Sequence, residues 1–554
     1  MPVNLSDLVR DAAASRASHP ALVTDSRTVT WAELDRLVHA VAGGLTARGV
    51  RRGDRVAMML GNSLEFAVAY FGILRAGAVA VPLNTAYTPA ELAHIVQSCE
   101  PVLIVADEAT AETARSQDVP VVVAGSDEWR TLMVGKVSPP AGITGPEDLA
   151  VLLFTAGTSG NPKGVMLSHR ALVSNLDQLA SVEDPPAMTP DDVTLAVLPL
   201  FHVYGLNAVL GMVARLAGTA VLVPRFDPAT TLAAIRRHRV TNVAGAPPMF
   251  VAWSAQSELR ESLERVRLMV SGSAPLLPEV AQQFATIAAK PVWEGYGMTE
   301  AAPVITSTLV SGRPKPGSVG QPLPGVEIEL RDEDGEVAHD EDPGEIFVRG
   351  PNLFSGYWPD GDQGPDADGW FGTGDVGVLD ADGDLFLVDR RGDLILVSGF
   401  NVYPREVEKV ISAMDEVAEV AVTGVPHPYT GEAVRAIVVP VEGREITGDE
   451  VLSYCETRLA RFKCPTIVDV VTELPHSVTG KVAKGRIPPA AAVGVEDGDQ
   501  TAVSESDADA AEEGAQDAVG LDAADLDAAD EHPTVAAIEP ELPLEEETDQ
   551  RRDG

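Results

Sequence analysis

A glycine-rich loop that also carries hydroxyl and amino groups occupies residues 155–164, with the sequence Thr-Ala-Gly-Thr-Ser-Gly-Asn-Pro-Lys-Gly. Glycines let backbone N–H groups approach an anion closely, while the hydroxyls and the lysine add donors and positive charge. The composition favours a phosphate-binding loop, although a plain turn from a strand into a helix is the alternative. A Walker A loop is excluded because Lys163 is followed by Gly164 rather than by Ser or Thr. The candidate phosphate ligands are Thr155, Gly157, Thr158, Ser159, Gly160 and Lys163.

Two more segments place acids and hydroxyls beside aromatic residues. Residues 294–300 read Glu-Gly-Tyr-Gly-Met-Thr-Glu, and a tight turn there would bring Tyr296 beside a planar base. Thr299 and Glu300 would then reach a phosphate and its metal ion, whereas an isolated Thr-Glu pair is more typical of a helix N-terminus. Asp375 is expected in a turn after an aromatic strand, where it could accept hydrogen bonds from two neighbouring hydroxyls or form a local Asx turn.

Two single residues complete the candidates from side-chain chemistry. Lys481 ends the segment Pro-His-Ser-Val-Thr-Gly-Lys at 475–481 and could stabilise negative charge that develops during a reaction, unless it is a solvated loop lysine. His202 lies in Pro-Leu-Phe-His-Val-Tyr-Gly at 199–205, and a lone histidine is more often packed or exposed than catalytic.

The elements that must position these residues alternate between helices and short apolar strands over the first 380 residues. This alternation predicts an α/β fold with parallel sheets covered by helices. The apolar stretch from Phe66 to Leu83 is interpreted as a helix, 66–74, and a buried strand, 78–82, rather than as a membrane span. Other expected strands are 55–59, 102–105, 121–123, 149–154 and 219–223.

The texture changes at residue 316 and again at residue 389. Short strands at 327–330, 345–348 and 385–388, separated by Gly, Asp and Pro, predict an antiparallel or barrel-like subdomain. Beyond it, helices 404–413 and 449–459 and strands 394–397, 417–423, 433–440 and 467–471 predict a small α+β domain. The expected division is therefore 1–388, 389–490 and a tail, 491–554.

Charge and composition exclude several partners. The net charge is −42, which argues against a nucleic-acid partner. Residues 491–554 carry 21 acidic side chains but only two arginines and no aromatic residue, so we expect this tail to be disordered. Three scattered cysteines and an N-terminus without a secretory signal favour a reducing, cytoplasmic location.

Together these segments resemble the adenylate-forming superfamily, which includes acyl-CoA synthetases, firefly luciferase and the adenylation domains of peptide synthetases. The family loop reads Ser/Thr-Gly-Thr-Thr/Ser-Gly-x-Pro-Lys-Gly and holds the pyrophosphate part of ATP. The resemblance extends from about residue 20 to 488 and follows several motifs in order. It implies an N-terminal AMP-binding domain and a mobile C-terminal domain that moves about a hinge, where this chain carries Gly392.

The resemblance also implies roles for single residues. Tyr296 would lie against adenine, Thr299 would contact the α-phosphate, and Glu300 with Thr155 would hold Mg²⁺. His202 would stand between the acid and the CoA channels, and Lys481 would serve the adenylation step. The other implied ATP or CoA contacts are Gly272, Ser273, Ala274, Gly297, Asp375 and Arg390 at the nucleotide and Gly399 at the pantetheine tunnel.

The implied reaction joins a carboxylic acid to ATP to form acyl-AMP and then transfers the acyl group to coenzyme A. The amino-acid sequences of the motifs favour a medium- or long-chain fatty acid as the substrate. An aryl-acid CoA ligase, a ligase that loads a carrier protein, and a non-catalytic scaffold with an acidic interaction tail are the alternatives. Peripheral membrane contact and a homodimer stay open.

Overall fold

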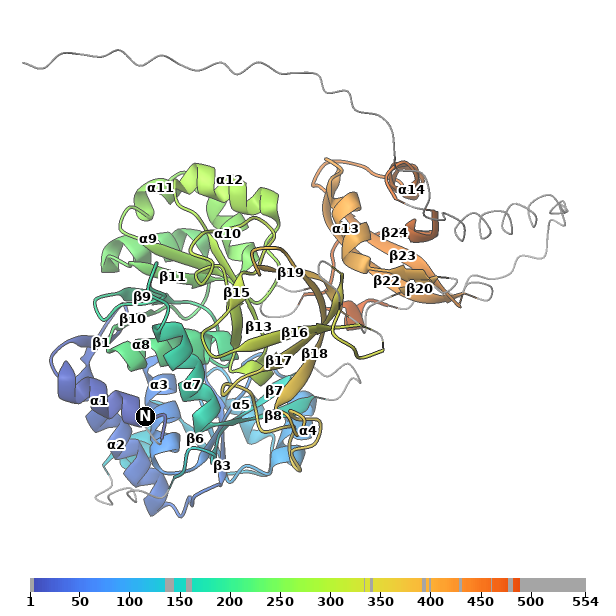
Figure 1. The fold of residues 1–554 in the computed structure, drawn as a ribbon. Helices are drawn as coiled ribbons and strands as arrows, with labels where there is room; N and C mark the ends of the chain where they lie inside the picture. Colours follow the sequence, from blue (N-terminus) through green and yellow to red (C-terminus); the bar gives the residue numbers. More distant parts are fainter. Residues whose placement is uncertain are drawn as a thin grey trace, which may run out of the picture. The chain divides into compact units, whose positions relative to one another are not determined.

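The computed structural model of the chain describes residues 4–134, 144–155, 162–332, 334–338, 342–390, 395–397, 400–427, 431–459, 461–476 and 482–488 (Figure 1). The predictions for the tail, 491–554, fall outside these residues. So do six residue predictions, namely those for Gly157, Thr158, Ser159, Gly160, Gly399 and Lys481, together with the hinge residue Gly392.

A six-stranded sheet carries the strands that flank the glycine-rich loop. Its order is β6-β5-β3-β4-β7-β8, and all neighbours are parallel except β7 and β8. Apolar residues dominate its central strands, which suits a sheet buried on both faces. The strands are β3 (Arg55–Met59), β4 (Val79–Pro82), β5 (Leu103–Ala106), β6 (Val121–Val123), β7 (Leu149–Thr155) and β8 (Lys163–Ser168).

A nine-stranded sheet supplies most of the remaining site residues. Its order is β15-β14-β13-β12-β11-β9-β10-β1-β2, with a parallel centre from β13 to β1 and antiparallel strands at both edges. The strands are β1 (Pro20–Val23), β2 (Thr28–Thr30), β9 (Val193–Ala196), β10 (Thr219–Leu222), β11 (Asn242–Gly245), β12 (Leu268–Ser271), β13 (Trp293–Gly297), β14 (Val304–Ser307) and β15 (Gln321–Pro322). The predicted parallel α/β architecture is confirmed.

Helices α2 (Trp31–Ala47) and α3 (Leu64–Arg75) join the two sheets. They pack on each other, while α2 contacts β1 and β2 and α3 contacts β3 and β4. Their close approach requires glycine, because a Cβ at Gly72 would lie 2.6 Å from Cγ1 of Val41. The stretch predicted as a helix and a buried strand is indeed α3 followed by β4. Within the described residues, no helix is long and apolar enough to span a membrane.

Further helices cover the large sheets, and most begin with a capping side chain or proline. Thr88 and Glu91 form a capping box at α4, and Ser168 caps α7. Helices α9 to α12 lie together, coloured green in Figure 1. The described ranges are α4 (Pro89–Cys99), α5 (Ala111–Arg115), α6 (Asp127–Met133), α7 (His169–Ala180), α8 (Met212–Leu216), α9 (Pro228–His238), α10 (Pro247–Ser254), α11 (Leu259–Ser262) and α12 (Pro278–Ala288), after α1 (Asp7–Ser15).

A four-stranded antiparallel sheet, β16-β17-β18-β19, follows at residues 327–390. Its strands are β16 (Glu327–Arg331), β17 (Gly344–Arg349), β18 (Trp370–Leu379) and β19 (Leu385–Arg390). The predicted change to antiparallel strands is confirmed. The prediction of a turn at Asp375 is wrong, because this residue lies within β18 and pairs with Arg390 of β19.

The C-terminal part has its own sheet and core. The sheet order is β21-β20-β23-β22, with β24 paired in parallel to β23. Its core gathers Ile395, Val407, Val434 and Val451 from different elements. The strands are β20 (Ile395–Val397), β21 (Phe400–Val402), β22 (Val417–His427), β23 (Gly431–Pro440) and β24 (Ile467–Val470), and the helices are α13 (Pro404–Ser412) and α14 (Gly448–Glu456).

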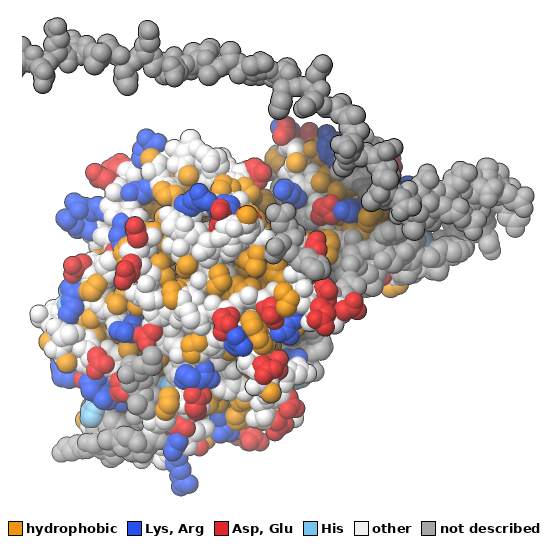
Figure 2. Space-filling view, in the orientation of Figure 1, with side chains coloured by type: hydrophobic (Ala, Val, Ile, Leu, Met, Phe, Trp, Pro, Cys, Tyr) orange, Lys and Arg blue, Asp and Glu red, His pale blue; other side chains and the backbone are white. Residues whose placement is uncertain are grey.

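The surface carries mixed charge. On the face drawn in Figure 2, acidic and basic side chains are intermixed. Several form ion pairs, such as Arg349 with Glu327 and Arg170 with Glu147.

Candidate active site

The glycine-rich loop joins two antiparallel strands. Thr155, at the end of β7, pairs with Lys163 at the start of β8. The alternative of a turn from a strand into a helix is therefore wrong. Thr155 and Lys163 both line one large cavity, so the end of β7 and the start of β8 contribute to the same cavity wall.

Lys163 is held by two side chains that the sequence did not single out. Its Nζ donates to Oε1 of Gln363 at 2.8 Å and lies 4.9 Å from the centre of the Tyr357 ring. The second contact is a cation–π interaction between the ammonium group and the ring face. The lysine is therefore positioned at the cavity as a cation.

Glu300 faces the same cavity from a short 3₁₀ helix, η2 (Thr299–Ala301). Its side chain is buried, and its Oε1 accepts a hydrogen bond of 2.7 Å from the Tyr357 hydroxyl. Burial, together with the Glu300 charge, raises the pKa of Tyr357, so the phenol stays protonated and donates. Met298 occupies the N-cap position, so Thr299 is not a helix cap.

Tyr296 and Asp375 meet directly. The Tyr296 hydroxyl donates to Oδ2 of Asp375 at 2.6 Å. The tight turn expected at Gly-Tyr-Gly is wrong, because these residues end strand β13 and pair with β14. Gly297 is needed for another reason: a Cβ there would lie 2.0 Å from the Pro303 carbonyl oxygen. Across β18 and β19, Asp375 lies opposite Arg390.

His202 lines the cavity as a neutral ring. Its Nδ1 accepts a hydrogen bond of 3.4 Å from the backbone N–H of Tyr204, which places the ring proton on Nε2. Burial lowers the pKa of His202 to about 4. A neutral ring suits the predicted position between two channels, and proton transfer is not required of it.

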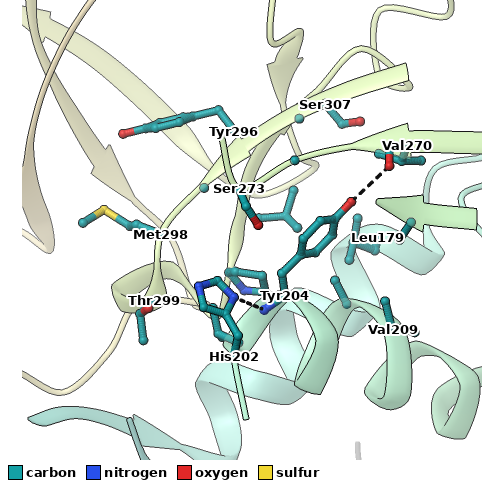
Figure 3. Close-up of a pocket in the computed structure, with 18 of the residues that line it drawn as sticks. Leu179, His202, Tyr204, Val209, Val270, Ser273, Tyr296, Met298, Thr299 and Ser307 are labelled. Atoms are coloured by element: carbon teal, nitrogen blue, oxygen red, sulfur yellow. Dashed lines mark hydrogen bonds between the residues drawn. The ribbon is translucent and has the colours of Figure 1, made fainter. Parts of the chain in front are cut away.

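Tyr204 reaches across the cavity from the start of a π-helix, η1 (Tyr204–Gly211), as Figure 3 shows. Its hydroxyl donates to the Val270 carbonyl at 3.4 Å. Its ring lies against Gly272, where a Cβ would come within 2.9 Å of the ring. Gly272 therefore leaves room for Tyr204, a role that adds to its predicted place beside the nucleotide.

A buried amide ties the π-helix to the Glu300 turn. Asn207, fully buried in η1, donates from Nδ2 to the carbonyls of Leu172 at 3.1 Å and Ala302 at 2.7 Å. π-Helical segments are rare and are often found at functional sites. The segment η1 spans eight residues. Asn207 therefore connects the cavity wall to the segment that carries Thr299 and Glu300.

Glu294 is a buried acid beside the site. Burial raises its pKa to about 7, and the nearby backbone N–H of Leu276 opposes part of that rise. Its backbone is paired with Thr308, whose hydroxyl accepts from the Glu294 N–H at 2.9 Å. The neutral form of this acid is therefore favoured up to a higher pH than in an exposed glutamate.

The cavity has a volume of about 490 Å³, within the usual range for ligand pockets. Polar side chains line one part of the cavity, which we call its mouth, and apolar side chains line the rest. Figure 3 shows His202 and Thr299 near each other, with Leu179 and Val209 on another part of the wall. Ser273 and Gly297 also line it, while Ala274 is not among its lining residues. The mouth residues are Thr155, Lys163, Glu300, Tyr357 and Thr373, and the apolar interior includes Leu179, Met188, Val209, Met212 and Leu309.

The sequence missed Tyr357, Gln363, Tyr204 and Asn207. Tyr357 follows Gly356 in an aromatic run, Tyr-Trp-Pro, which is a weak local signal. Tyr204 lies in the segment quoted at 199–205 but had no role assigned to it, and Gln363 and Asn207 carry no pattern of their own, because their importance comes from contacts with distant segments.

Fold and cavity together indicate an α/β enzyme, because one cavity brings Lys163 and Glu300 together with an apolar wall, the usual composition of a small-molecule site. The sequence matches the AMP-binding enzyme family over residues 9–358 and the AMP-binding enzyme C-terminal domain over residues 406–481. The chain belongs to this family and is an AMP-forming acyl-CoA synthetase. It activates a carboxylic acid with ATP and forms an acyl-CoA thioester.

Individual relatives cover nearly the whole length. A long-chain-fatty-acid–CoA ligase of Bacillus subtilis is 31% identical over 531 residues, which cover 87% of this chain and 94% of the relative. A feruloyl-CoA synthase of Amycolatopsis is 37% identical over 83% of this chain and 93% of the relative. The crystal structure of ATP-bound MatB from Rhodopseudomonas palustris superposes with a TM-score of 0.81 at 37% identity and covers 88% and 98% of the two chains.

Proposed function

We propose that the acid substrate is a medium-length carboxylic acid with an alkyl or aryl-alkyl body, and that it binds in the cavity with its carboxylate at the mouth. The observation that carries this is the continuity of one cavity from Lys163 and Glu300 to an apolar interior. A long-chain-fatty-acid–CoA ligase among the relatives supports the alkyl reading, and a feruloyl-CoA synthase supports the aryl reading.

In the first half-reaction, a carboxylate oxygen attacks the α-phosphate of ATP and pyrophosphate leaves. We assign Lys163 and the hydroxyls of the glycine-rich loop to the departing phosphates, where fixed donors stabilise developing charge. Asp375 and Arg390 would hold the ribose hydroxyls, and Tyr296 would lie beside the base. The hydrogen bond from Tyr296 to Asp375 would fix that carboxylate.

The residues at the mouth fit Mg²⁺, the cofactor of this class. Glu300 and Thr155 offer oxygen atoms to the cavity, and Mg²⁺ prefers carboxylates combined with phosphate oxygens. When bound, the ion neutralises charge on the phosphates. Tyr357 would keep Glu300 oriented through its 2.7 Å hydrogen bond.

In the second half-reaction, the thiol of coenzyme A attacks the acyl carbon and AMP leaves. We propose that residues 389–490 form a domain that moves between the two half-reactions, with Lys481 serving adenylation and Gly399 bordering the pantetheine. His202 would separate the acid from the thiol channel. Residues 1–388 would form the AMP-binding domain, and 491–554 would lie outside the catalytic fold. A cytoplasmic location, peripheral membrane contact and a homodimer stay proposals.

A panel of acids tests the proposed substrate. AMP release and acyl-CoA formation are measured with ATP, Mg²⁺ and coenzyme A against acids from acetate to oleate, benzoate and cinnamate. We expect the highest kcat/KM for acids of medium length. A maximum at acetate or at oleate contradicts the proposed size.

A variant tests the role proposed for Lys481. We expect Lys481→Ala to lose on the order of 10²–10³ in the rate of adenylation. Undiminished adenylation by the variant contradicts the role of Lys481.

A further inference from the structure

The inner end of the cavity is polar, although its walls are apolar. Thr194 of β9 and Asn242 of β11 are register partners in neighbouring parallel strands, so their side chains point to the same face of the sheet. Both line the cavity. Parallel neighbours lie about 4.8 Å apart, which makes these two side chains an adjacent pair.

The sheet register shows how deep this pair lies. Asn242 is opposite Leu268 of β12, and Gly272, beside the Tyr204 ring, follows four residues later along the same strand direction. At roughly 3.3 Å per residue, Thr194 and Asn242 lie about 13 Å from the level of Gly272, measured along the strands toward their amino ends. Nucleotides bind at the carboxyl ends of parallel strands, so Asn242, the first residue of β11, is at the end farthest from the reacting carboxylate.

The amide of Asn242 is oriented by the protein. Its Nδ2 donates to the Ala187 carbonyl at 2.7 Å, and a carbonyl oxygen can only accept, so the amide cannot be flipped. Asn242 is 4% exposed. No donor to its Oδ1 is found among the described residues, so this acceptor is available to a ligand in the cavity.

Thr194 has only a weak partner. Its hydroxyl donates to Sδ of Met188 at 4.0 Å, and a thioether is a poor acceptor. A plain alkyl chain that filled the inner end would leave Oδ1 of Asn242 without a donor and the Thr194 hydroxyl with only the thioether, which costs binding energy. A group with a hydroxyl would satisfy them.

We propose that the acid substrate carries a hydroxyl at the end distal to its carboxylate, and that Asn242 accepts the hydrogen bond from this hydroxyl while Thr194 contacts it. This inference rests on the proposed function, because it concerns the acid in the same cavity. Two kinds of acid offer this chemistry: an aryl-alkenoic acid with a phenolic hydroxyl, and an ω-hydroxy alkanoic acid.

Matched substrate pairs test the proposal. The ratio of kcat/KM for AMP release is measured for 4-hydroxycinnamate against cinnamate and for 10-hydroxydecanoate against decanoate. We expect the hydroxylated acid to be favoured about tenfold or more in one pair, because a buried acceptor left unpaired penalises the analogue that lacks the hydroxyl. The pair that discriminates identifies the aryl or the alkyl source.

Variants then assign the preference to the polar pair. Asn242→Leu should abolish it while activity with the acid that lacks the hydroxyl persists, and Thr194→Val should reduce it and serves if Asn242→Leu does not fold. Leu195→Met, an apolar exchange at the next residue of β9, which is not among the lining residues, should leave the ratio unchanged. Equal use of both acids in each pair by the wild type, or an unchanged ratio in the polar-pair variants, overturns the inference. Absence of AMP release with every acid would instead overturn the proposed function on which it rests.

Discussion

Tyr357 links the two charged groups at the mouth of the cavity. Its ring lies under Nζ of Lys163, and its hydroxyl donates to Glu300. One aromatic side chain thus sets the distance between the cation and the carboxylate that we assign to the phosphates and to Mg²⁺. The resemblance of the sequence to a known family indicated Lys163 and Glu300, but neither composition nor spacing indicated Tyr357, which is 194 residues after Lys163.

Removing the Tyr357 hydroxyl should weaken the use of Mg·ATP more than the use of the acid. A hydrogen bond to a charged group contributes about 1.5–3 kcal/mol, so Tyr357→Phe should lower kcat/KM for Mg·ATP on the order of tenfold or more. Steady-state kinetics with varied Mg·ATP and varied acid measure this. Tyr70→Phe is the control, because the Tyr70 hydroxyl is buried in α3 without a partner in the described part of the chain. Equal kinetics for Tyr357→Phe and Tyr70→Phe would refute the role of Tyr357.

His169 should make the protein sensitive to acid. It is buried, its Nδ1 accepts from the Leu5 backbone N–H at 3.0 Å, and burial lowers its pKa to about 4. The unfolded chain has a histidine pKa of about 6.5, so below that pH it binds a proton that the folded protein does not. The stabilisation is complete above about pH 6.5 and declines as the pH falls toward 4, by about 3 kcal/mol.

Chemical unfolding at pH 7.5 and pH 4.5 measures this contribution. The pKa of His202 is also lowered, so the wild type loses stability at low pH from both histidines. The contribution of His169 is therefore the difference between the stability lost by the wild type and the stability lost by His169→Gln. The variant should lose less stability than the wild type between the two pH values. Identical losses would show that His169 does not titrate as its burial implies.

The π-helix η1 is the element that joins the acyl pocket to the Glu300 turn. Its start carries Tyr204, which crosses the cavity, and its middle carries Asn207, which holds the Ala302 carbonyl. A Cβ at Gly211, the end of the element, would lie 2.7 Å from Oδ1 of Asn207. The glycine therefore leaves space for the amide.

Breaking this link should cost stability and disturb nucleotide use. Asn207→Leu leaves two carbonyls without their donor, which costs about 1–3 kcal/mol, and Asn207→Asp should cost more because a carboxylate would face carbonyl oxygens. Both variants should raise the KM for Mg·ATP, since Ala302, whose carbonyl loses its donor, directly follows η2. Thermal unfolding and ATP kinetics check this. A loss of stability with an unchanged KM would limit Asn207 to a structural role.

At the element scale, apolar strands were predictable and glycine-rich turns were not. Val121–Val123 and Arg55–Met59 are strands with the predicted bounds, since short apolar runs with Gly, Pro or Asp close to their ends have few alternatives. Gly297 was interpreted as part of a turn, yet it lies in a strand that approaches Pro303. Glycine serves both situations, and only the position of a distant segment distinguishes them.

At the scale of the whole molecule, the fold class followed from alternating elements, whereas the site required long-range contacts. Thr155 and Lys163 come from one hairpin, Glu300 from the helix η2 between two strands of the other large sheet, and Tyr357 from the segment before β18. The polar inner end of the cavity was equally hidden, because Thr194 and Asn242 become neighbours only through the register of β9 and β11.

The central claim is that the acid attacks the α-phosphate of ATP before the acyl group passes to coenzyme A. Incubation of a carboxylic acid labelled with ¹⁸O in both carboxylate oxygens, with ATP, Mg²⁺ and coenzyme A, followed by mass spectrometry of the products, tests it directly. One labelled oxygen bridges to phosphorus in acyl-AMP and stays on AMP when the thiol attacks. We predict AMP with one ¹⁸O, acyl-CoA with the other and unlabelled pyrophosphate. Formation of ADP with label in inorganic phosphate, or unlabelled AMP, would contradict the account.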